Sequence, residues 1–505
     1  MKNKTIFVIA ALVAIMLISC PQEPGEPGTG NTHDSDGSGI DNPNAAAYVC
    51  TVTTTGAYYV NATKRGNLDI PAGTQIDSYR SGCTVSGGKV YVWGSYYGGG
   101  SEKYAYWVDG VRTDLSVPTG YYINGLIAVS GGKVYLRGEY SYRSQDGSVD
   151  IRKACYWVDG IRTDLDIPDG YVSDYHPTFA ISNSKVYAAG RYSSYRNEDY
   201  SQIEENRKAC YWINGVRTDL NVPAGIEFSE ARSITVSGDK VYVLGSYGNF
   251  VDLGDGSYNY FRYIGKTCYW IDGVRTDLDI PAETESSEAN AITVSGGKVY
   301  VSGSYGNYGG FSITYMGKAC YWVDGVKTDL SVPAGTELSS AYNPIVSGGK
   351  VYMLGEIYDD GYDYLGHNYK YCYWVDGTRT DLVVPDEAEI AFRAYYLTVS
   401  GGKVYVYGDS CRDERTTEQY YKGAWYWVDG GRTDIDVPGY VGGFDNTYFA
   451  VIGGKLYIAC GLGTMDQGWP ADNPMQRERA FYWINGVKQE LPDVENIRAI
   501  SLVVE

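Results

Sequence analysis

One short sequence recurs along the whole chain, and it restricts the folds that the chain can adopt. In residues 318–333 it reads KACYWVDGVKTDLSVP, with a Trp followed by Val, then Asp, then Gly. The Trp occurs eight times, 50 to 58 residues apart, as Trp107, Trp157, Trp212, Trp270, Trp322, Trp374, Trp427 and Trp483. A period of this length is typical of proteins built from similar structural repeats, so we expect a series of such units.

Each repeat predicts four β-strands, which we name a to d in chain order. Asp324-Gly325 separates two strand-like runs, and both central residues of a type I′ hairpin turn need positive φ angles, which Asp and Gly tolerate. Upstream, a Gly-rich turn at 295–297 separates residues 291–294 from residues 298–301, which predicts a second hairpin. The b strands carry consecutive apolar residues, as expected for strands covered on both faces. Stacked four-stranded antiparallel sheets of this kind predict an all-β fold, the β-propeller.

The two ends of the chain each hold part of one further unit. Residues 58–61 and 68–71 resemble a degenerate Trp hairpin, and residues 48–52 precede it as a b strand that lacks an a strand. Residues 496–504 resemble an a strand with nothing after it. Pairing the two ends would complete a composite blade and leave no free sheet edge. This arrangement predicts eight continuous blades and one composite blade, nine in all, with an eight-bladed ring as the alternative.

The N-terminal segment predicts export and membrane anchoring. Lys2 and Lys4 precede an apolar run at 6–18 that suits a signal-peptide core but is too short to span a bilayer. The end of this run, LISC, resembles the lipobox of bacterial lipoproteins, which implies lipidation of Cys20. The alternative is an ordinary secretory cleavage that leaves Cys20 as a free thiol. We therefore expect a signal peptide at 1–19, a lipidated Cys and disordered tether at 20–47, and a propeller at 48–505.

The order of elements resembles that of Kelch-type β-propellers across nearly all of residues 74–492. A Gly-Gly turn, a KVYV strand and an aromatic strand carry this resemblance, although here the Gly pair precedes strand b and the Trp lies in strand c. The chain is more similar to bacterial lipoproteins built of YW-[DN]-G repeats, most of which have no assigned activity. The resemblance implies a propeller held by a lipid anchor in the bacterial cell envelope. It specifies neither a ligand nor the side of the membrane that the protein faces.

The cysteines fall into two groups. Equivalent positions in neighbouring blades are about 10 Å apart, whereas a disulfide needs Cα atoms within about 7 Å. Cysteines at equivalent positions are therefore expected to fill space between blades as small hydrophobic residues. Five cysteines share such a position, two residues before the repeat Trp: Cys155, Cys210, Cys268, Cys320 and Cys372. The others are irregular and their pairing is left open: Cys50, Cys83, Cys411 and Cys460.

The two faces of the predicted ring differ in sequence. The a–b and c–d turns lie on one face and are nearly identical, with residues such as Lys298 and Asp324 that are expected to form weak surface pairs. The b–c loops and d–a connections lie on the other face, which we call the variable-loop face, and a rigid scaffold with variable loops on one side is typical of binding proteins. The b–c loops are rich in Tyr, Gly, Ser, Asn and Asp, a composition common in binding surfaces.

Two sets of candidate ligand-binding residues follow from this reasoning. In the b–c loops they are Tyr97, Tyr142, Tyr195, Tyr260, Tyr308, Tyr364, Tyr421 and Trp469, and the alternative is that each side chain covers a blade edge. Four residues before the conserved apolar residue of strand a, a second set is expected to ring the channel mouth on the same face. It comprises Tyr79, Tyr175, Glu230, Glu288, Arg393 and Asp445, with Ile123 and Ser340 at the same position in two other repeats.

Composition excludes several functional classes. The 61 acidic residues outnumber the 42 basic ones and give a net charge of −19, which disfavours nucleic acid and anionic lipid surfaces as partners. Only three histidines are present, so His-dependent triads and His-rich zinc sites are poorly supplied. The acidic stretch at 359–363 is interpreted as solvated loop charge, and no metal or cofactor is predicted.

The sequence therefore predicts a lipid-anchored envelope propeller that binds an extracytoplasmic glycan or protein through its variable-loop face. The protein would touch the membrane through its lipid anchor only. One alternative is a scaffold within an envelope complex. Another is a carbohydrate-active enzyme that uses a carboxylate pair drawn from Glu230, Glu288 and Asp445, although no motif selects these residues and no catalytic activity is predicted.

Overall fold

The computed structural model describes most of the predicted propeller. The described residues are 47–53, 55–61, 63–76, 81–98, 101–118, 121–143, 150–173, 177–194, 207–252, 261–308, 315–336, 338–358, 369–384, 392–410, 423–435, 444–462, 479–489 and 497–504. These residues form β-strands and turns. In this part of the chain no helix is long and apolar enough to cross a membrane. The predicted signal peptide, Cys20 and the tether up to residue 46 lie outside it.

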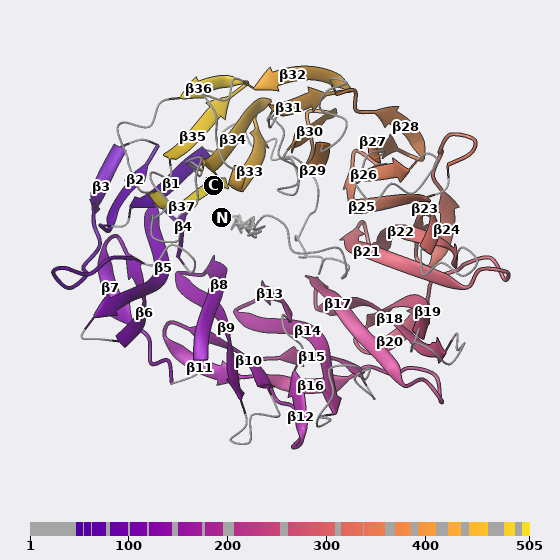
Figure 1. Ribbon diagram of the computed structural model, residues 1–505, viewed down its shortest axis with the longest axis horizontal. Coiled ribbons are helices and arrows are strands. Elements are labelled where there is room, and N and C mark those ends of the chain that lie inside the picture. The colour runs from indigo at the N-terminus through magenta and orange to yellow at the C-terminus, as the bar shows by residue number, and fades with distance from the viewer. Residues whose placement is uncertain are drawn as a thin grey trace, which may run out of the picture.

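Nine antiparallel sheets follow one another around a ring, as Figure 1 shows. In each sheet strand a lies towards the centre of the ring and strand d lies at the rim. The first four blades comprise β4 (Gly82–Ser86), β5 (Lys89–Gly98), β6 (Ser101–Val108) and β7 (Val111–Asp114); β8 (Tyr121–Ser130), β9 (Lys133–Arg143), β10 (Asp150–Val158) and β11 (Ile161–Asp164); β12 (Tyr171–Ser173), β13 (Thr178–Ser182), β14 (Lys185–Ser194), β15 (Lys208–Ile213) and β16 (Val216–Asp219); and β17 (Phe228–Ser237), β18 (Lys240–Asp252), β19 (Phe261–Ile271) and β20 (Val274–Asp277).

In the third blade strand a is divided into β12 and β13, which both pair with β14; in Figure 1 β13 lies towards the centre of the ring and β12 at its outer edge. The next four blades comprise β21 (Ser286–Ser295), β22 (Lys298–Tyr308), β23 (Tyr315–Val323) and β24 (Val326–Asp329); β25 (Leu338–Ser347), β26 (Lys350–Tyr358), β27 (Tyr369–Val375) and β28 (Thr378–Asp381); β29 (Phe392–Ser400), β30 (Lys403–Ser410), β31 (Gly423–Val428) and β32 (Gly431–Ile435); and β33 (Phe444–Ile452), β34 (Lys455–Leu462), β35 (Arg479–Ile484) and β36 (Val487–Gln489).

The ninth blade joins the two ends of the chain. Its strand order is β37 (Ile497–Val504), β1 (Ala47–Thr53), β2 (Ala57–Val60) and β3 (Thr63–Asn67). Strand β1 pairs with β37 in antiparallel register from Ala47 opposite Val504 to Thr53 opposite Ile497. The predicted composite blade and the count of nine are thus confirmed, and the eight-bladed alternative is wrong.

The c–d hairpins have the predicted turn geometry. Asp324 has a φ of 51° and Gly325 a φ of 87°, so both central residues lie in the left-handed region that a type I′ turn requires. The Asp324 side chain also accepts a hydrogen bond from the backbone N–H of Val299 in strand b, at 2.9 Å. Only one oxygen is needed, which is why Asn214 serves equally well through a 3.0 Å bond from Val186 N–H. These residues therefore have a structural role that the sequence prediction of surface pairs with lysines missed.

At six described seams the repeat Trp joins a blade to the one before it by a hydrogen bond. All eight side chains are at most 1% exposed. In the fifth blade, the indole N–H of Trp322 donates to the backbone carbonyl of Asp279, at 2.7 Å, and the N–H of Asp279 donates to the carbonyl of Gly325. One residue of the fourth blade thus makes two hydrogen bonds to the fifth. The apolar cores lie between neighbouring sheets and are composed of residues from both.

The five repeat cysteines are buried and free, as predicted. The Cys155 thiol donates to the carbonyl of Gly138 within its own blade, at 3.4 Å, rather than contacting a cysteine of a neighbouring blade. Burial raises the pKa of this thiol well above its ordinary value. These cysteines are therefore packing residues and not nucleophiles.

Candidate ligand-binding site

In seven of the nine blades a glycine occupies the position of strand b that faces the inner end of strand a on the variable-loop face. In the fourth blade, a Cβ on Gly245 would lie 2.0 Å from the carbonyl oxygen of Glu230 and 2.9 Å from the Trp270 ring. Only glycine lets strand a come this close to strand b. The a–b register shifts immediately afterwards, between Ala231 and Ser233, which is a β-bulge with Arg232 as the extra residue. The bulge thus places the side chains of Glu230 and Arg232 in contact with one another.

The residue after this glycine, or after Cys460 in the eighth blade, pairs with a residue of strand a. These pairs form a polar level near the centre of the ring. We call them the inner polar pairs. Their side chains are mostly polar or charged, and those of Ser246, Ser304 and Asp409 are at most 4% exposed. The pairs are Tyr122 with Glu139, Glu230 with Ser246, Glu288 with Ser304, Ser340 with Glu356, Arg393 with Asp409, and Asp445 with Gly461.

Most of the described channel-mouth predictions fall on these pairs. Glu230, Glu288, Arg393 and Asp445 all occupy the strand a position. In the second blade the predicted residue is wrong by one position. An additional register shift places Tyr122 opposite Glu139, and Ile123, at 1% exposure, belongs to the apolar core.

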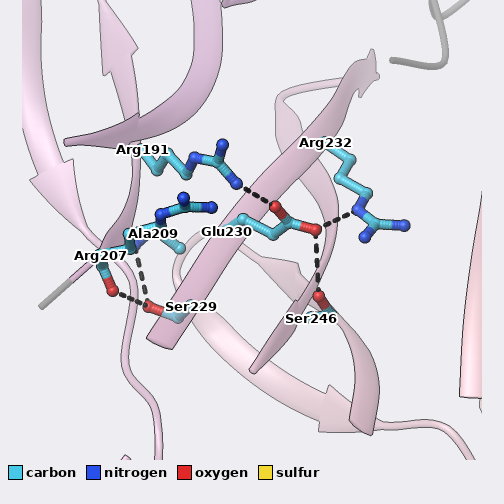
Figure 2. A network of polar contacts seen from close by, with 7 residues as sticks. All are labelled: Arg191, Arg207, Ala209, Ser229, Glu230, Arg232 and Ser246. Carbon is cyan, nitrogen blue, oxygen red and sulfur yellow. Dashed lines mark hydrogen bonds and ion pairs between the residues drawn. The ribbon is translucent and has the colours of Figure 1, made fainter. Parts of the chain in front are cut away.

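Glu230 lies within a cluster of three arginines, shown in Figure 2. Arg191 of β14 in the third blade contacts one carboxylate oxygen of Glu230, and Arg232 contacts the other. The Ser246 hydroxyl adds a 3.3 Å hydrogen bond to the second oxygen. Arg207, which immediately precedes β15, is the third guanidinium near this carboxylate. We call Arg191, Arg207 and Arg232 the arginine cluster.

An aromatic ring and a backbone hydrogen bond support the arginine cluster. The guanidinium carbons of Arg191 and Arg207 lie 5.8 and 4.6 Å from the centroid of the Phe228 ring, within the range of cation–π attraction. The backbone of Arg207 is fixed by Ser229, whose N–H donates to the Arg207 carbonyl at 2.9 Å. The Arg191 and Arg232 side chains retain 19% and 28% exposure, so solvent or a ligand can reach both.

Arginines of the cluster act on the pKa values of two glutamates, Glu230 and Glu288. Burial acts to raise the pKa of Glu230, but Arg232, Arg191 and Arg207 outweigh it and lower the pKa below the ordinary value. At the equivalent position of the next blade, burial raises the pKa of Glu288, the charge of Glu230 adds to that effect, and Arg232 opposes it. Arg232 therefore interacts electrostatically with both carboxylates, and the pKa values of the two glutamates are shifted in opposite directions.

Carboxylate and hydroxyl groups dominate other parts of the polar level. The hydroxyl of Tyr342 donates to Glu356, and burial raises the pKa of that carboxyl. The hydroxyl of Tyr407 donates to Asp409 at 3.1 Å, opposite Arg393. Hydroxyl donors and carboxylate acceptors are thus placed at intervals around the ring, blade after blade, and these groups suit the recognition of a ligand with many hydroxyls.

The predicted loop residues are placed only in part. Tyr97 is 61% exposed near the end of β5, opposite Glu102 of β6. Tyr142 and Tyr308 belong to strands, paired with Ile151 and Tyr315, because strands b and c continue beyond their predicted ends. The remaining candidates lie outside the described residues: Tyr79, Tyr175, Tyr195, Tyr260, Tyr364, Tyr421 and Trp469.

Sequence reasoning missed the three arginines. Arg191 follows the strand b glycine, Arg207 follows a b–c loop, and Arg232 is the extra residue of a bulge. The only signal for Arg191 is that the position after this glycine varies among Ser, Glu, Arg and Asp within an otherwise constant strand. Their convergence on Glu230 arises from contacts between two blades, which the repeat pattern does not specify.

Comparisons with known proteins name no family for this chain. No family model matches the chain, and no curated protein matches it. Among solved structures, an ulvan lyase is similar over 72% of this chain and 96% of its own, at 10% identity and a TM-score of 0.39. A Pyrococcus horikoshii acylaminoacyl peptidase is similar over 74% of this chain and 52% of its own, at 15% identity and a TM-score of 0.34. A Trypanosoma rangeli sialidase is similar over 79% of this chain and 58% of its own, at 11% identity and a TM-score of 0.32.

At these TM-scores the similarity carries no argument about this chain. The chain spans about half the length of the peptidase, at 52%, and 58% of the sialidase. The chain is thus a nine-bladed β-propeller whose function has to be inferred from its own residues.

Proposed function

We propose that this protein is a lipid-anchored envelope propeller that binds an anionic extracytoplasmic glycan at the arginine cluster. The supporting observation is that three guanidiniums gather at one point of an acidic protein. They lie near the carboxylate of Glu230, and the Arg191 and Arg232 side chains stay partly exposed, whereas the whole chain carries a net charge of −19. A carboxylate or sulfate group of a ligand would be attracted to these guanidiniums, which bind such groups in a bidentate manner.

The surrounding inner polar pairs favour a glycan over a protein partner. Carboxylates such as Glu288 and Glu356 accept hydrogen bonds from sugar hydroxyls, and Ser304 and Tyr342 lie opposite or beside them. Among the described residues, one large hydrophobic side chain near the end of a b strand is highly exposed, that of Tyr97, so no broad apolar surface for a protein partner is described there. The other highly exposed ones are mainly valines at the start of the rim strands, such as Val111 and Val326.

The test is a glycan array followed by calorimetric titration, both with the full chain. Arg232→Gln removes one guanidinium and is expected to weaken binding of an acidic oligosaccharide about tenfold or more, as for loss of a buried charged hydrogen bond. Arg275→Gln is the matched control, because Arg275 pairs with Asp277 on the rim strand β20, away from the cluster. Equal affinities of the two variants, or binding of neutral and acidic glycans alike, would contradict the proposal.

A third variant separates charge from packing. Glu230→Gln removes the carboxylate that the arginines now contact, so an anionic ligand would no longer compete with it. We expect this variant, where folded, to bind the acidic oligosaccharide at least as tightly as the unmodified protein. A protein partner captured from envelope extracts, with no glycan bound, would instead favour the scaffold alternative.

The opposite pKa shifts of Glu230 and Glu288 favour glycoside cleavage as a second candidate function. A carboxyl with a raised pKa near one with a lowered pKa is the arrangement of a general acid with its partner carboxylate. Both oxygens of Glu230 are engaged by arginines, which favours binding over a role as nucleophile. Release of reducing ends from a bound oligosaccharide, abolished by Glu288→Gln, would establish the enzyme.

A further inference from the structure

Two of the irregular cysteines lie at the seam between the composite blade and the first blade, which we call the closing seam. Cys50 belongs to β1 in the composite blade, and Cys83 belongs to β4 in the first blade. Both are buried, at 0% and 1% exposure, and both belong to the same apolar cluster. The Cys83 thiol contributes to the raised pKa of the Cys50 thiol, as expected for neighbouring sulfurs in one buried cluster. This contact differs from those of the repeat cysteines, such as Cys155, which donates to a backbone carbonyl of its own blade.

The register shows that both cysteines replace a pair that is in contact elsewhere in the ring. Cys50 lies opposite Val60, the residue before the c–d turn. Tyr242 of the fourth blade occupies the same position, opposite Ile271. Cys83 lies opposite Val92 of strand b, as Ile292 of the fifth blade lies opposite Val301.

At the seam between the fourth and fifth blades, Tyr242 and Ile292 share one buried cluster. Tyr187 with Ile234, and Tyr352 with Leu397, do the same at two other seams. At the closing seam, both members of this tyrosine–aliphatic contact are cysteine. Replacing a tyrosine by cysteine removes apolar contact area, and a disulfide would offset that loss by joining the two blades covalently.

We propose that Cys50 and Cys83 form a disulfide that locks the closing seam of the propeller. The two free thiols lose two protons and two electrons, and a sulfur–sulfur bond of about 2.05 Å forms between them. The electrons reduce the disulfide of an envelope thiol–disulfide oxidoreductase to two thiols, through a mixed disulfide with one of the cysteines. The inference rests on the proposed export of the chain, since disulfides persist in oxidising compartments, but not on the proposed ligand.

The timing of the reaction follows from burial. Burial and the neighbouring thiol raise the pKa of Cys50, and the thiolate is the species that attacks a disulfide. The closed seam also excludes an oxidoreductase from both sulfurs. The bond would therefore form while the chain folds, before the first blade packs against the composite blade, and would then be protected from reductants.

The first experiment maps the bond in the full chain purified from bacterial membranes. The protein is denatured without reductant, alkylated and digested with trypsin, which releases Cys83 in the nine-residue peptide 81–89, SGCTVSGGK. We expect this peptide to be joined to the peptide that contains Cys50, while Cys155 and the other repeat cysteines are alkylated. Alkylation of both Cys50 and Cys83 in more than half of the molecules would overturn the proposal.

A second experiment separates the geometry of the seam from the location of the protein. The full chain is unfolded, reduced and refolded in a glutathione redox buffer, and the same peptides are quantified. We expect the Cys50–Cys83 bond to form and to raise the melting temperature by roughly 3–6 °C over the reduced protein. The double variant Cys50→Ala with Cys83→Ala should melt at the same temperature with and without reductant. Failure of the bond to form on refolding contradicts the proposal whatever the ligand experiments show.

Discussion

The indole Nε1 of Trp322 donates a hydrogen bond to the backbone carbonyl of Asp279 in the preceding blade, at 2.7 Å. The same bond occurs at five other described seams, as in Trp374 to Ser331 at 2.8 Å and Trp107 to Asp69 at 3.0 Å. It explains why the repeat keeps Trp at a position that is otherwise a purely apolar core site. The Trp supplies both the volume of a large aromatic side chain and a donor that reaches the next sheet.

Trp322→Phe is expected to lower the free energy of unfolding by more than Trp157→Phe does. Both substitutions remove similar ring volume, but the Nε1 of Trp157 is buried without a hydrogen-bond partner, so only Trp322→Phe leaves a carbonyl unsatisfied. The difference between the two variants should be about 1 kcal/mol, the typical value of one hydrogen bond. Urea unfolding of both variants under identical conditions measures it, and equal losses would contradict this role of the indole N–H.

Gly245→Ala is expected to prevent correct folding of the fourth blade. The new methyl group would lie 2.0 Å from the Glu230 carbonyl and 2.9 Å from Trp270, and neither the backbone nor a buried Trp can yield. Overpacking of this kind costs about 1–3 kcal/mol or more. Gly431→Val is the matched control, since Val occupies the equivalent position of β7, β16, β20 and β24 and the site is exposed. Thermal melting should show a large loss for the first variant and none for the second.

Asp324→Asn is expected to leave stability unchanged, whereas Asp324→Ala should destabilise the protein. Asn keeps the oxygen that accepts from Val299 N–H and tolerates the φ of 51°, as Asn214 does at its own turn. Ala loses the hydrogen bond and is strained at positive φ, at a combined cost of about 1–3 kcal/mol. Chemical unfolding of the two variants separates these cases, and a loss for Asn equal to that for Ala would show that the carboxylate charge matters instead.

Glu230→Gln and Glu288→Gln should have opposite dependences on pH. The pKa of Glu230 is lowered in the folded state, so its ionised form stabilises the protein above its unfolded pKa, and this contribution is lost as the pH falls through the lowered value. The pKa of Glu288 is raised, so its proton stabilises the folded state at low pH, and this contribution is lost as the pH rises through the raised value.

At pH 7 we therefore expect Glu230→Gln to destabilise the protein by about 3–5 kcal/mol, as for breaking a buried ion pair. Glu288→Gln should be neutral or stabilising at the same pH. Each difference should shrink as the pH falls through the pKa of the unmodified carboxyl, at a lower pH for Glu230 than for Glu288. Unfolding curves from pH 3 to pH 8 test this, and parallel pH profiles for the two variants would contradict the assigned charges.

Cys20→Ser is expected to release the protein from membranes. The variant lacks the thiol that a lipoprotein signal would lipidate, so the chain should move from the membrane fraction to the soluble envelope fraction or stay uncleaved. Fractionation together with labelling by a radioactive fatty acid measures this. Equal labelling of the variant and the unmodified protein would contradict lipidation at Cys20.

The fold was predictable because its determinants are local. Asp324-Gly325 specifies a turn within one hairpin, and the repeat Trp reports the period, so the strands and their number follow from short stretches of sequence. The composite blade was also predictable, because the first segment lacks an a strand and the last segment is one. Its boundaries in the structure, at Ala47 and Val504, differ little from the predicted ones.

The candidate site was predictable only in part because its determinants lie in different blades. The position of Glu230 follows from counting along strand a, but its partners Arg191 and Arg207 come from the third blade. Bulges change the count, which is why Tyr122 rather than Ile123 joins the polar level. No local rule states where a bulge occurs, since it depends on the contact between strand a and a glycine of strand b.

The pairing of β1 with β37 imposes an order on synthesis and folding. Strand β1 leaves the ribosome long before its inner neighbour β37, and the two can pair only when β37 has been made. Until then β1 presents an unpaired edge, and unpaired edges recruit other strands. Completion of the ring thus depends on β37. A chain truncated before Ile497 would keep an unpaired strand edge that is prone to aggregation, however well its eight continuous blades are formed.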